Sequence, residues 1–466
     1  MAIRGQRRRR LRLLAALFGA GIVVGAGGYV ALERMAQARA ETAVAKMRER
    51  LPADTRFAYS GLDASFIAQS ATLTSAVFRR DGQQLRAATL TIGDVAETGG
   101  GNLRAGRIVA RDVSGRDGNG LRLAADRVTL SDLVINPVGD ALRSLGEAHV
   151  STLSVGKDRA ELRATDLTLG GVTPKRLGRF HAGTLELRGL TADAADREVL
   201  RDVELNGLDI AALPPLTRIP AMTPDDVATA ARNLGYDALR VGKAAFYRAE
   251  RRRALVRGLE SRQDTDGDAR IWYTGADHVA LRTPESAPEM LTRMVGDDGM
   301  LRGRFAGRQV YDAKAGTLAL EDMSLTVENG GELTGTLSFA DLPADSTGGF
   351  MPAQASLAQA KLAGLEVTVA DKGILDPALN ALAARSGLSR EQLVERRLGA
   401  IAQKARGSSQ TLHASVEALR EFLNKGGRLR LRMDPERNIA MSKAMMAFMF
   451  RPVRTAEALN LRIERP

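Results

Sequence analysis

Residues 85–95 read Leu85-Arg86-Ala87-Ala88-Thr89-Leu90-Thr91-Ile92-Gly93-Asp94-Val95, and this stretch decides the fold. At its centre apolar and polar residues alternate, so Leu90 and Ile92 share one face of a strand and the threonines share the other. Short runs of the same kind follow, and most end in Gly, Asp or Asn, the residues that suit tight turns. The pattern predicts a mainly β fold built around a repetitive antiparallel sheet.

An acidic residue followed by an aliphatic one recurs within or beside these runs. The five pairs are Asp94-Val95, Asp112-Val113, Asp132-Leu133, Asp166-Leu167 and Asp202-Val203. Their steps of 18, 20, 34 and 36 residues indicate a period of about 17–18 residues, which we interpret as two short strands and two turns per unit. A period of this length is typical of a repeat array rather than of a single closed catalytic domain.

The aliphatic residues of these runs form a stripe that is the candidate binding surface. If the sheet is a curved groove, the stripe lines an apolar channel able to take acyl chains. If the sheet is instead sandwich-like, the stripe is an ordinary buried face packed on helices, and the sequence leaves both readings open. The candidate residues are Leu90, Ile92, Leu121, Leu123, Val128, Leu130, Leu153, Val155, Leu167, Leu169, Leu185, Leu187, Val203 and Leu205.

The N-terminus carries a topology signal followed by an apolar segment. Residues 13–32 are uncharged, and twenty helical residues span roughly 30 Å, the thickness of a bilayer core. We therefore expect a retained single-pass transmembrane helix in a bacterial inner membrane, with residues 1–12 in the cytoplasm and the bulk of the chain in the periplasm. The basic residues of the signal are Arg4, Arg7, Arg8, Arg9, Arg10 and Arg12, and the anchoring residues are Leu13, Leu14, Leu17, Phe18, Ile22, Val23, Val24 and Val30.

Three further segments follow the anchor. Residues 33–50 favour a linker helix, and residues 51–360 form the β-rich body, interrupted by a helical insertion near 223–248 that Thr223-Pro224-Asp225-Asp226 would open. Residues 361–466 read as a C-terminal α/β segment. It has helices near 376–405 and 411–424, and Gly426 is placed to end the second helix.

Composition argues against several classes of protein. The formal net charge is +12, but six of the charges sit in the N-terminal arginine run and the remaining charges are well mixed, so we expect no nucleic-acid partner. The chain has no cysteine, which excludes disulfides and thiol chemistry. Its four histidines lie in different segments without metal-ligand spacing, and residues 264–268 lack the order of a calcium loop. We expect no catalytic residue, no metal and no cofactor.

Several stretches together resemble a known family. The chain is similar to the AsmA-like and YdgA-like (domain of unknown function) proteins of the bacterial envelope, with a tail like that of an alphaproteobacterial branch. The resemblance implies a periplasmic, β-rich body tethered to the inner membrane, with a groove lined by aliphatic side chains and a link to phospholipid transport. No catalytic residue is implied. The stretches are Leu51-Pro52, Phe57-Ala58-Tyr59-Ser60-Gly61-Leu62, residues 85–95, Asp371-Lys372-Gly373, Gly426-Gly427-Arg428-Leu429 and Asn460-Leu461-Arg462-Ile463.

Two functional hypotheses follow. The first is a non-enzymatic envelope protein that binds or shields phospholipid in an apolar β-groove and supports outer-membrane homeostasis. The second is a membrane-tethered periplasmic scaffold that assembles or regulates another envelope complex, whose partners would be envelope proteins docking on sheet edges and on the C-terminal helices. An envelope hydrolase is the weakest class, because no cluster of carboxylates or histidines is evident in the sequence.

Overall fold

The fold is known from a computed structural model of the chain. The described residues are 40–42, 45, 55–65, 68–80, 82–99, 102–118, 120–136, 141–189, 196–211, 235–284, 294–312, 314–342, 360–406, 409–436, 439–440, 442–443, 446–447 and 452–466. They form two compact units that meet in sequence near Arg251, and each unit is treated by itself below. The sequence suggested a boundary at residue 360 instead.

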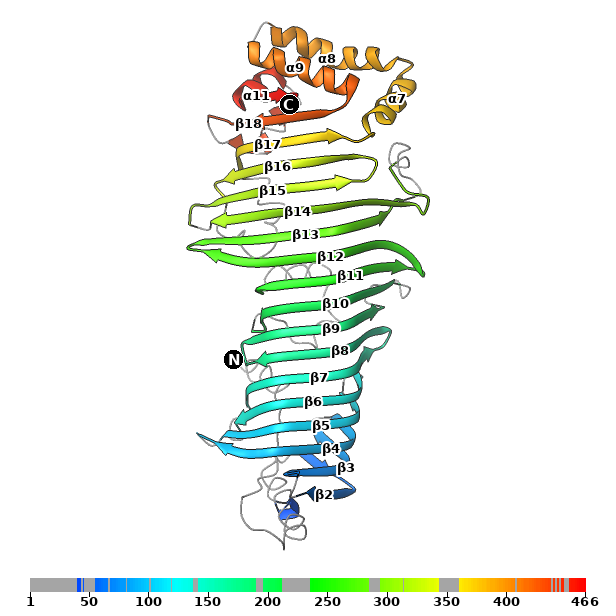
Figure 1. The fold of residues 1–466 in the computed structure, drawn as a ribbon, viewed down its shortest axis with the longest axis vertical. Helices are drawn as coiled ribbons and strands as arrows, with labels where there is room; N and C mark the ends of the chain where they lie inside the picture. The colour runs from blue at the N-terminus through cyan, green and yellow to red at the C-terminus, as the bar shows by residue number, and fades with distance from the viewer. Residues whose placement is uncertain are drawn as a thin grey trace. The chain divides into compact units, whose positions relative to one another are not determined.

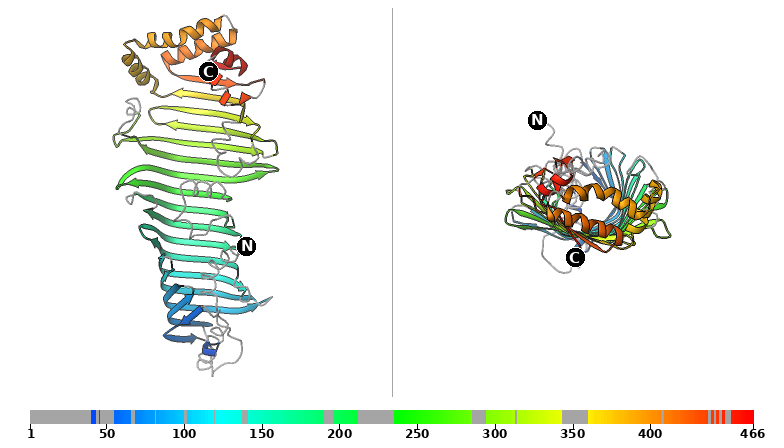
Figure 2. Two further views of the ribbon diagram at one scale, coloured as in Figure 1. Left: turned by 180° about the vertical axis from the view of Figure 1, so that it is seen from behind. Right: turned by 90° about the horizontal axis from the view of Figure 1, so that it is seen from above.

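The first unit is an antiparallel sheet of long strands (Figure 1). From β3 to β10 each strand pairs with the strands next to it in the chain, and β1 and β2 both pair with β3. Seen from behind and from above, these strands bend along their length (Figure 2). The strands are β1 (Thr55–Ala58), β2 (Gly61–Ser65), β3 (Ser70–Arg80), β4 (Gln83–Thr98), β5 (Asn102–Arg116), β6 (Arg122–Asn136), β7 (Ala141–Lys157), β8 (Ala160–Val172), β9 (Arg176–Arg188), β10 (Asp196–Asp209) and β11 (Ala238–Arg248).

The second unit is an antiparallel sheet with helices at its C-terminal end. Its pairing also follows chain order from β12 to β17, after which β18 and β19 pair with β17 and β20 pairs with β18. The elements are β12 (Arg251–Asp266), β13 (Ala269–Arg282), β14 (Met300–Asp312), β15 (Thr317–Val327), β16 (Gly331–Ala340), β17 (Lys361–Asp371), α7 (Leu375–Ser386), α8 (Arg390–Arg406), α9 (Gln410–Lys425), β18 (Arg428–Met433), β19 (Ile439–Ala440), α11 (Pro452–Ala458) and β20 (Arg462–Glu464).

The mainly β, antiparallel prediction is therefore confirmed, but the repeat unit was read wrongly. Each repeat holds one long strand and one hairpin turn, for example β5 over Asn102–Arg116, rather than two short strands. The recurring aspartates do not end strands. Asp94, Asp132 and Asp166 lie inside strands with φ of 55°, 55° and 52°, the left-handed region that Asp enters more readily than most residues. A residue that marks turns elsewhere thus marks kinks here.

Four of the five recurring aspartates, all except Asp112, lie against a glycine on the next strand. A Cβ on Gly106 would lie 2.7 Å from the Cβ of Asp94, and one on Gly146 would lie 2.9 Å from the Cβ of Asp132. The pairs Asp166 with Gly183 and Asp202 with Gly242 repeat the arrangement at 3.3 and 3.0 Å. Strands β4 and β5 have the same number of residues across this kink. Gly93 pairs with Arg107 and Val95 pairs with Ala105, so one residue lies between these pairs on each strand. The kink therefore bends both strands together without inserting a residue.

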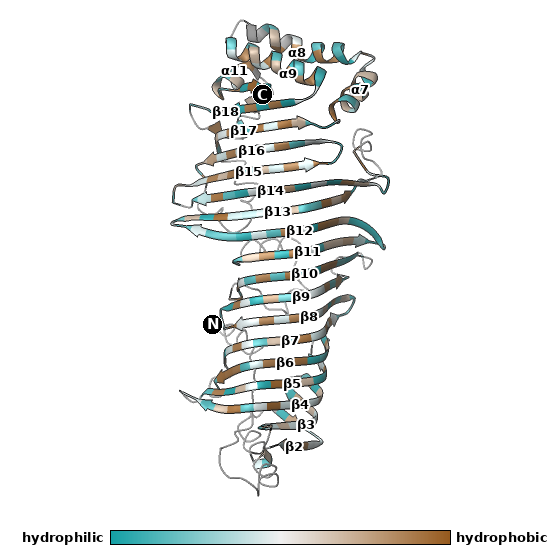
Figure 3. Cartoon of the chain, viewed as in Figure 1, coloured by the Kyte–Doolittle hydropathy of each residue, from teal (hydrophilic) through white to brown (hydrophobic). Residues whose placement is uncertain are grey.

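At the kinks, the alternation of buried apolar residues with exposed residues shifts by one position. The alternation of apolar and polar residues is visible along the strands in Figure 3. In β5 the buried residues are Ala105, Ile108, Ala110 and Val113, so steps of two alternate with steps of three. Strand β4 shows the same order, with Leu85, Ala87, Leu90 and Ile92 buried. A strict period of two would move residues beyond a kink to the other face. The three-residue step keeps them on one face as the strand bends.

The core of the second unit is enclosed by helices as well as by strands. Leu412 and Val416 of α9 pack with Ala402 of α8, Ala456 of α11 and Leu461. The Ser415 hydroxyl accepts a 3.0 Å hydrogen bond from the backbone N–H of Ile463, which fixes α9 to β20. A separate cluster inside the sheet consists of Trp272, Tyr311, Leu318, Phe339, Leu342 and Ala360. The two predicted C-terminal helices are confirmed, the first divided at Gly387 into α7 and α8, and Gly426 ends α9 with φ of 66°.

Two further predictions are wrong. The helical insertion near 223–248 fails where it can be compared, because residues 238–248 form strand β11; Gly242 lies against the kinked Asp202, a close approach that belongs to the sheet. Residues 223–234 of that insertion lie outside the described residues. Leu121 is not in a strand: it closes the β5–β6 turn, where its backbone N–H donates to Asp117 Oδ1 at 2.8 Å.

The predicted anchor, residues 13–32, and most of the linker, residues 33–50, also lie outside the described residues. Within the part of the chain that the structure describes, no helix has both the length and the hydropathy to cross a bilayer.

Candidate apolar face and its polar reverse

The strand register of the first unit joins its apolar residues into rows that run from strand to strand. We call the side of β3–β10 that carries these rows the apolar face, and the opposite side the polar face. One row crosses eight strands without a polar residue: Ala71, Ile92, Ile108, Leu130, Ala148, Leu169, Phe180 and Leu205. At about 4.8 Å between strands this row extends roughly 34 Å.

The register distributes thirteen of the fourteen candidate residues over four rows. Leu90, Val128, Leu167 and Val203 lie in the row beside the one just given, which itself contains Ile92, Leu130, Leu169 and Leu205. Beyond the kinks, Leu153 and Leu185 share a third row, and Leu123, Val155 and Leu187 share a fourth. The remaining candidate, Leu121, lies in the turn described above.

Burial varies along the apolar face. Leu90 and Ile92 are 1% and 4% exposed, and Leu130, Leu167 and Val203 are also buried. The other eight strand candidates are only half-buried, Leu169 and Leu187 among them. An apolar face with half its members partly open differs from a sealed core, because solvent or a ligand still reaches it.

One carboxylate interrupts the apolar face. Glu198 of β10 lies directly opposite Leu187 and so ends the fourth row. Burial raises the pKa of the Glu198 carboxyl, and the nearby negative charge of Asp196 raises it further. No pattern in the sequence marks this residue: it stands among Arg197, Val199 and Leu200, and its face depends on the β9–β10 register.

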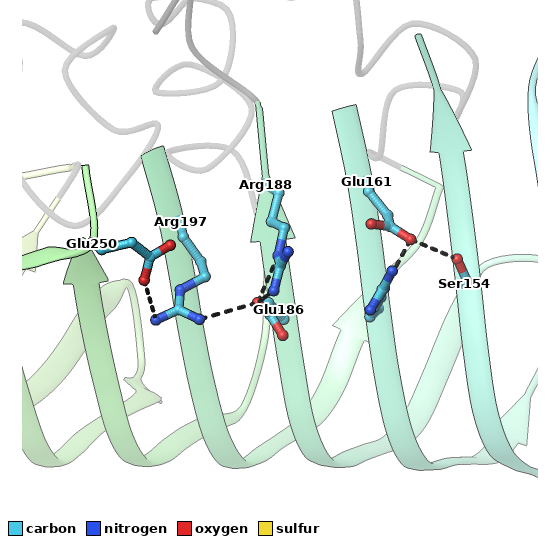
Figure 4. A network of polar contacts seen from close by, with 7 residues as sticks. Ser154, Glu161, Glu186, Arg188, Arg197 and Glu250 are labelled. Carbon is cyan, nitrogen blue, oxygen red and sulfur yellow. Dashed lines mark hydrogen bonds and ion pairs between the residues drawn. The ribbon is translucent and has the colours of Figure 1, made fainter. Parts of the chain in front are cut away.

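The polar face carries a network of ion pairs near the strand ends (Figure 4). Glu161 accepts from Arg163 Nε at 2.8 Å and from the Ser154 hydroxyl at 3.1 Å. These contacts, with the Arg163 hydrogen bond first, lower the pKa of the Glu161 carboxyl despite some burial. Because the Arg163 side chain is 56% exposed and the Glu161 side chain is only half-buried, the pair contributes little to stability.

A second group in the network centres on Arg197. Its guanidinium lies 3.7 Å from Glu186 and 3.3 Å from Glu250 (Figure 4). It also lies over the Tyr247 ring, 4.5 Å from the ring centre. Arg188 also contacts Glu186, at 2.6 Å. Glu186 and Glu250 thus neutralise two arginines that lie opposite each other on β9 and β10.

The described residues hold no group of three or more metal-ligating side chains. His149 and His181, which are far apart in sequence, both face Thr168 from opposite sides of β8, and Nδ1 of His149 lies 3.3 Å from the Thr168 hydroxyl. Residues 264–266 end β12, and there Asp264 pairs with Arg262 at 3.0 Å.

Comparison with known proteins concerns the other unit. A family model described as an uncharacterized protein matches residues 324–466, from within β15 to the last residue. No curated protein matches the chain. The apolar face, β3–β10, thus lies outside the matched residues.

Proposed function

We propose that this chain is a non-enzymatic protein of the bacterial cell envelope that holds lipid acyl chains against the apolar face. The observation that carries the proposal is the set of apolar rows across β3–β10, of which the fourth ends at Glu198. An acyl chain needs no specific polar contact, and each methylene removed from water contributes about 0.8 kcal/mol. The resemblance to AsmA-like proteins supports the same reading.

The geometry favours a long apolar ligand over a compact one. The longest row, at roughly 34 Å, exceeds the length of a single extended acyl chain and offers equivalent contacts at every strand. Half-buried residues such as Leu169 and Leu187 leave part of the surface open to such a ligand. The anchor expected at residues 13–32 would hold this surface beside the inner membrane, from which lipid would be drawn.

Site-specific photocrosslinking in cells tests the proposal. A benzophenone amino acid replaces Leu169 or Leu187 on the apolar face of the full chain, and matched variants carry it at Thr168 or Glu186, the preceding residues, which face the other side. Irradiation should add the mass of a phospholipid to peptides labelled at Leu169 and Leu187 but not at the control positions. Equal lipid labelling at all four positions, or none at any, would refute the groove.

A scaffold is the second candidate. Leu382 on α7 is 52% exposed, an apolar side chain on a helix that other envelope proteins could contact. The same photocrosslinking approach separates the candidates, because benzophenone at Leu382 of a scaffold would give one dominant protein adduct. Lipid adducts at Leu169 without a protein adduct at Leu382 would favour the groove.

A further inference from the structure

The polar face of the first unit contains a cavity that the apolar rows do not explain. It has a volume of about 640 Å³ and lies over the ends of β4–β8, beside the ion-pair network. Four arginines line it, Arg86, Arg116, Arg122 and Arg159, against two carboxylates, Asp158 and Glu161. The lining charge is therefore +4 − 2 = +2, although acidic and basic residues are well mixed over most of the chain.

Two of these arginines face each other directly. Arg116 of β5 pairs in register with Arg122 of β6, and the residues that follow in the same row are Gln84 on one side and Gly156 on the other. Like charges placed opposite each other across strands destabilise a sheet. Neither Arg116 nor Arg122 forms an ion pair with any carboxylate of the described chain.

In the same row of paired residues, a second pair of opposed arginines is neutralised by glutamates. Arg188 and Arg197 also face each other directly, on β9 and β10. Glu186 contacts both of them and Glu250 contacts Arg197. Glutamates lie beside Arg188 and Arg197, whereas a cavity lies beside Arg116 and Arg122. This cavity leaves room for a negatively charged group from outside the chain.

The carboxylates of the lining do not fill that role. Glu161 is already held by Arg163 and Ser154. Asp158 belongs to the β7–β8 turn and, among the described residues, forms no ion pair with Arg116 or Arg122. We propose that the cavity binds a multiply charged phosphate-type oxyanion, held by Arg116 and Arg122. Planar guanidinium groups match such oxygens with paired hydrogen bonds.

This inference goes beyond the proposed function, because the charged residues that line the cavity lie on the face opposite the apolar rows, although Leu123 of the fourth row also lines it. The anion could be the headgroup of a lipid or a phosphate compound in solution, and the chemistry of recognition is shared. A chain that captured no acyl chain could still bind the anion, so the two proposals fail separately.

Titration calorimetry on the full chain in non-ionic detergent tests the site. The ligands are inorganic pyrophosphate and water-soluble dioctanoyl phosphatidate, with zwitterionic dioctanoyl phosphatidylcholine for comparison. The test variant is Arg116→Gln/Arg122→Gln. The matched control is Arg111→Gln/Arg127→Gln, which removes a directly opposed arginine pair from the same two strands outside the cavity lining. The conservative variant Arg116→Lys/Arg122→Lys keeps the charge and removes the paired hydrogen-bond geometry.

Wild-type chain should bind pyrophosphate or phosphatidate, and the Gln double variant should bind at least about tenfold more weakly. The control pair should change affinity less than about twofold, and the Lys pair should lie between. Tighter binding of phosphatidate than of pyrophosphate identifies a lipid headgroup, and the reverse identifies a soluble phosphate. Absence of binding by both ligands, or equal losses in the two Gln variants, would overturn the site.

Discussion

The two units build similar antiparallel sheets, and a kink of the first can be compared with a bulge of the second. In the first unit, left-handed aspartates such as Asp94 and Asp132 kink paired strands with equal residue counts. In the second, Asp322 with φ of 49° accompanies a true bulge: between Leu320 and Met323 the strand holds two residues where its partner, between Leu337 and Gly335, holds one. A bulge loses a ladder position, whereas the paired kink keeps it. The first mechanism can repeat from strand to strand and leave a continuous apolar face.

The units also differ in what covers their apolar residues. Leu318 of the second unit is 1% exposed within an aromatic cluster, and α8, α9 and α11 close another cluster over β18 and β20. Leu169 of the first unit lies in the middle of its row and is half-buried. The same substitution should therefore be costly at Leu318 and mild at Leu169, and that contrast is what separates a core position from a position on a binding surface.

The largest expected effect comes from Leu318→Ala. Removing a fully enclosed leucine leaves a cavity, and we expect a loss of about 3 kcal/mol in the free energy of unfolding of the second unit. The matched Leu169→Ala should cost the first unit only about 1 kcal/mol, because its side chain is already partly hydrated. Chemical denaturation followed by hydrogen exchange of peptides from each unit measures both. Equal losses would mean that the apolar face is an ordinary core.

The second prediction concerns the kinks. Gly106→Ala places a Cβ 2.7 Å from the Cβ of Asp94, and the forced shift should cost about 1–3 kcal/mol. Gly99→Ala is the control, since no atom lies within 4 Å of the added Cβ. Adding Asp94→Gly should recover most of the loss, because it removes the atom that clashes. Hydrogen exchange in β4–β6 reports the change, and a Gly106→Ala chain as protected as wild type would argue against close pairing of the kinks.

Sequence patterns predicted that strands form but predicted neither the length of the strands nor the positions where they bend. The alternation at Leu90 and Ile92 gave the correct face, and the recurrence of Asp before an aliphatic residue marked real structural positions. Their meaning was misread because Asp favours turns and left-handed kinks by the same backbone preference. Distinguishing the two requires the opposing glycine, and Gly106 or Gly146 is recognisable only once the register is known.

The candidate surfaces show the same limit. Thirteen of the fourteen predicted aliphatic residues lie in the rows, because local alternation identifies a face. The cavity beside Arg116 and Arg122 was missed, since arginines at strand ends look like ordinary solvated charge until the register sets them opposite each other. Long-range pairing, which a single sequence does not encode in any short window, decides these sites.

The third prediction tests the helical cover of the second unit. Asp371 Oδ1 accepts hydrogen bonds from the backbone N–H groups of Ile374 and Leu375, at 3.0 and 3.1 Å, where α7 begins. Asp371→Ala should cost about 1 kcal/mol and lower the protection of α7 amides. Ser409→Ala removes a comparable bond, 3.1 Å to the N–H of Leu412, and should act on α9 instead. Loss of protection in β4–β8 after either change would contradict the independence of the two units.

The smallest effect is a pH dependence confined to the first unit. Burial against the apolar face, together with the charge of Asp196, raises the pKa of Glu198 above its value in the unfolded chain. The folded state therefore holds the Glu198 proton more tightly than the unfolded state does. The stability that this group contributes is complete below the unfolded pKa and falls as the pH rises through the raised folded pKa.

Glu198→Gln, which stays neutral, should flatten the pH dependence of first-unit stability just above the ordinary range of a glutamate and leave the second unit unchanged. Glu161→Gln is the matched comparison, because hydrogen bonding to Arg163 lowers the pKa of Glu161, so that its contribution is lost as the pH falls. Across the acidic range, the difference in unfolding free energy between each variant and wild type should change with pH in opposite directions for the two variants, and change in the same direction would mean that the apolar face does not desolvate Glu198.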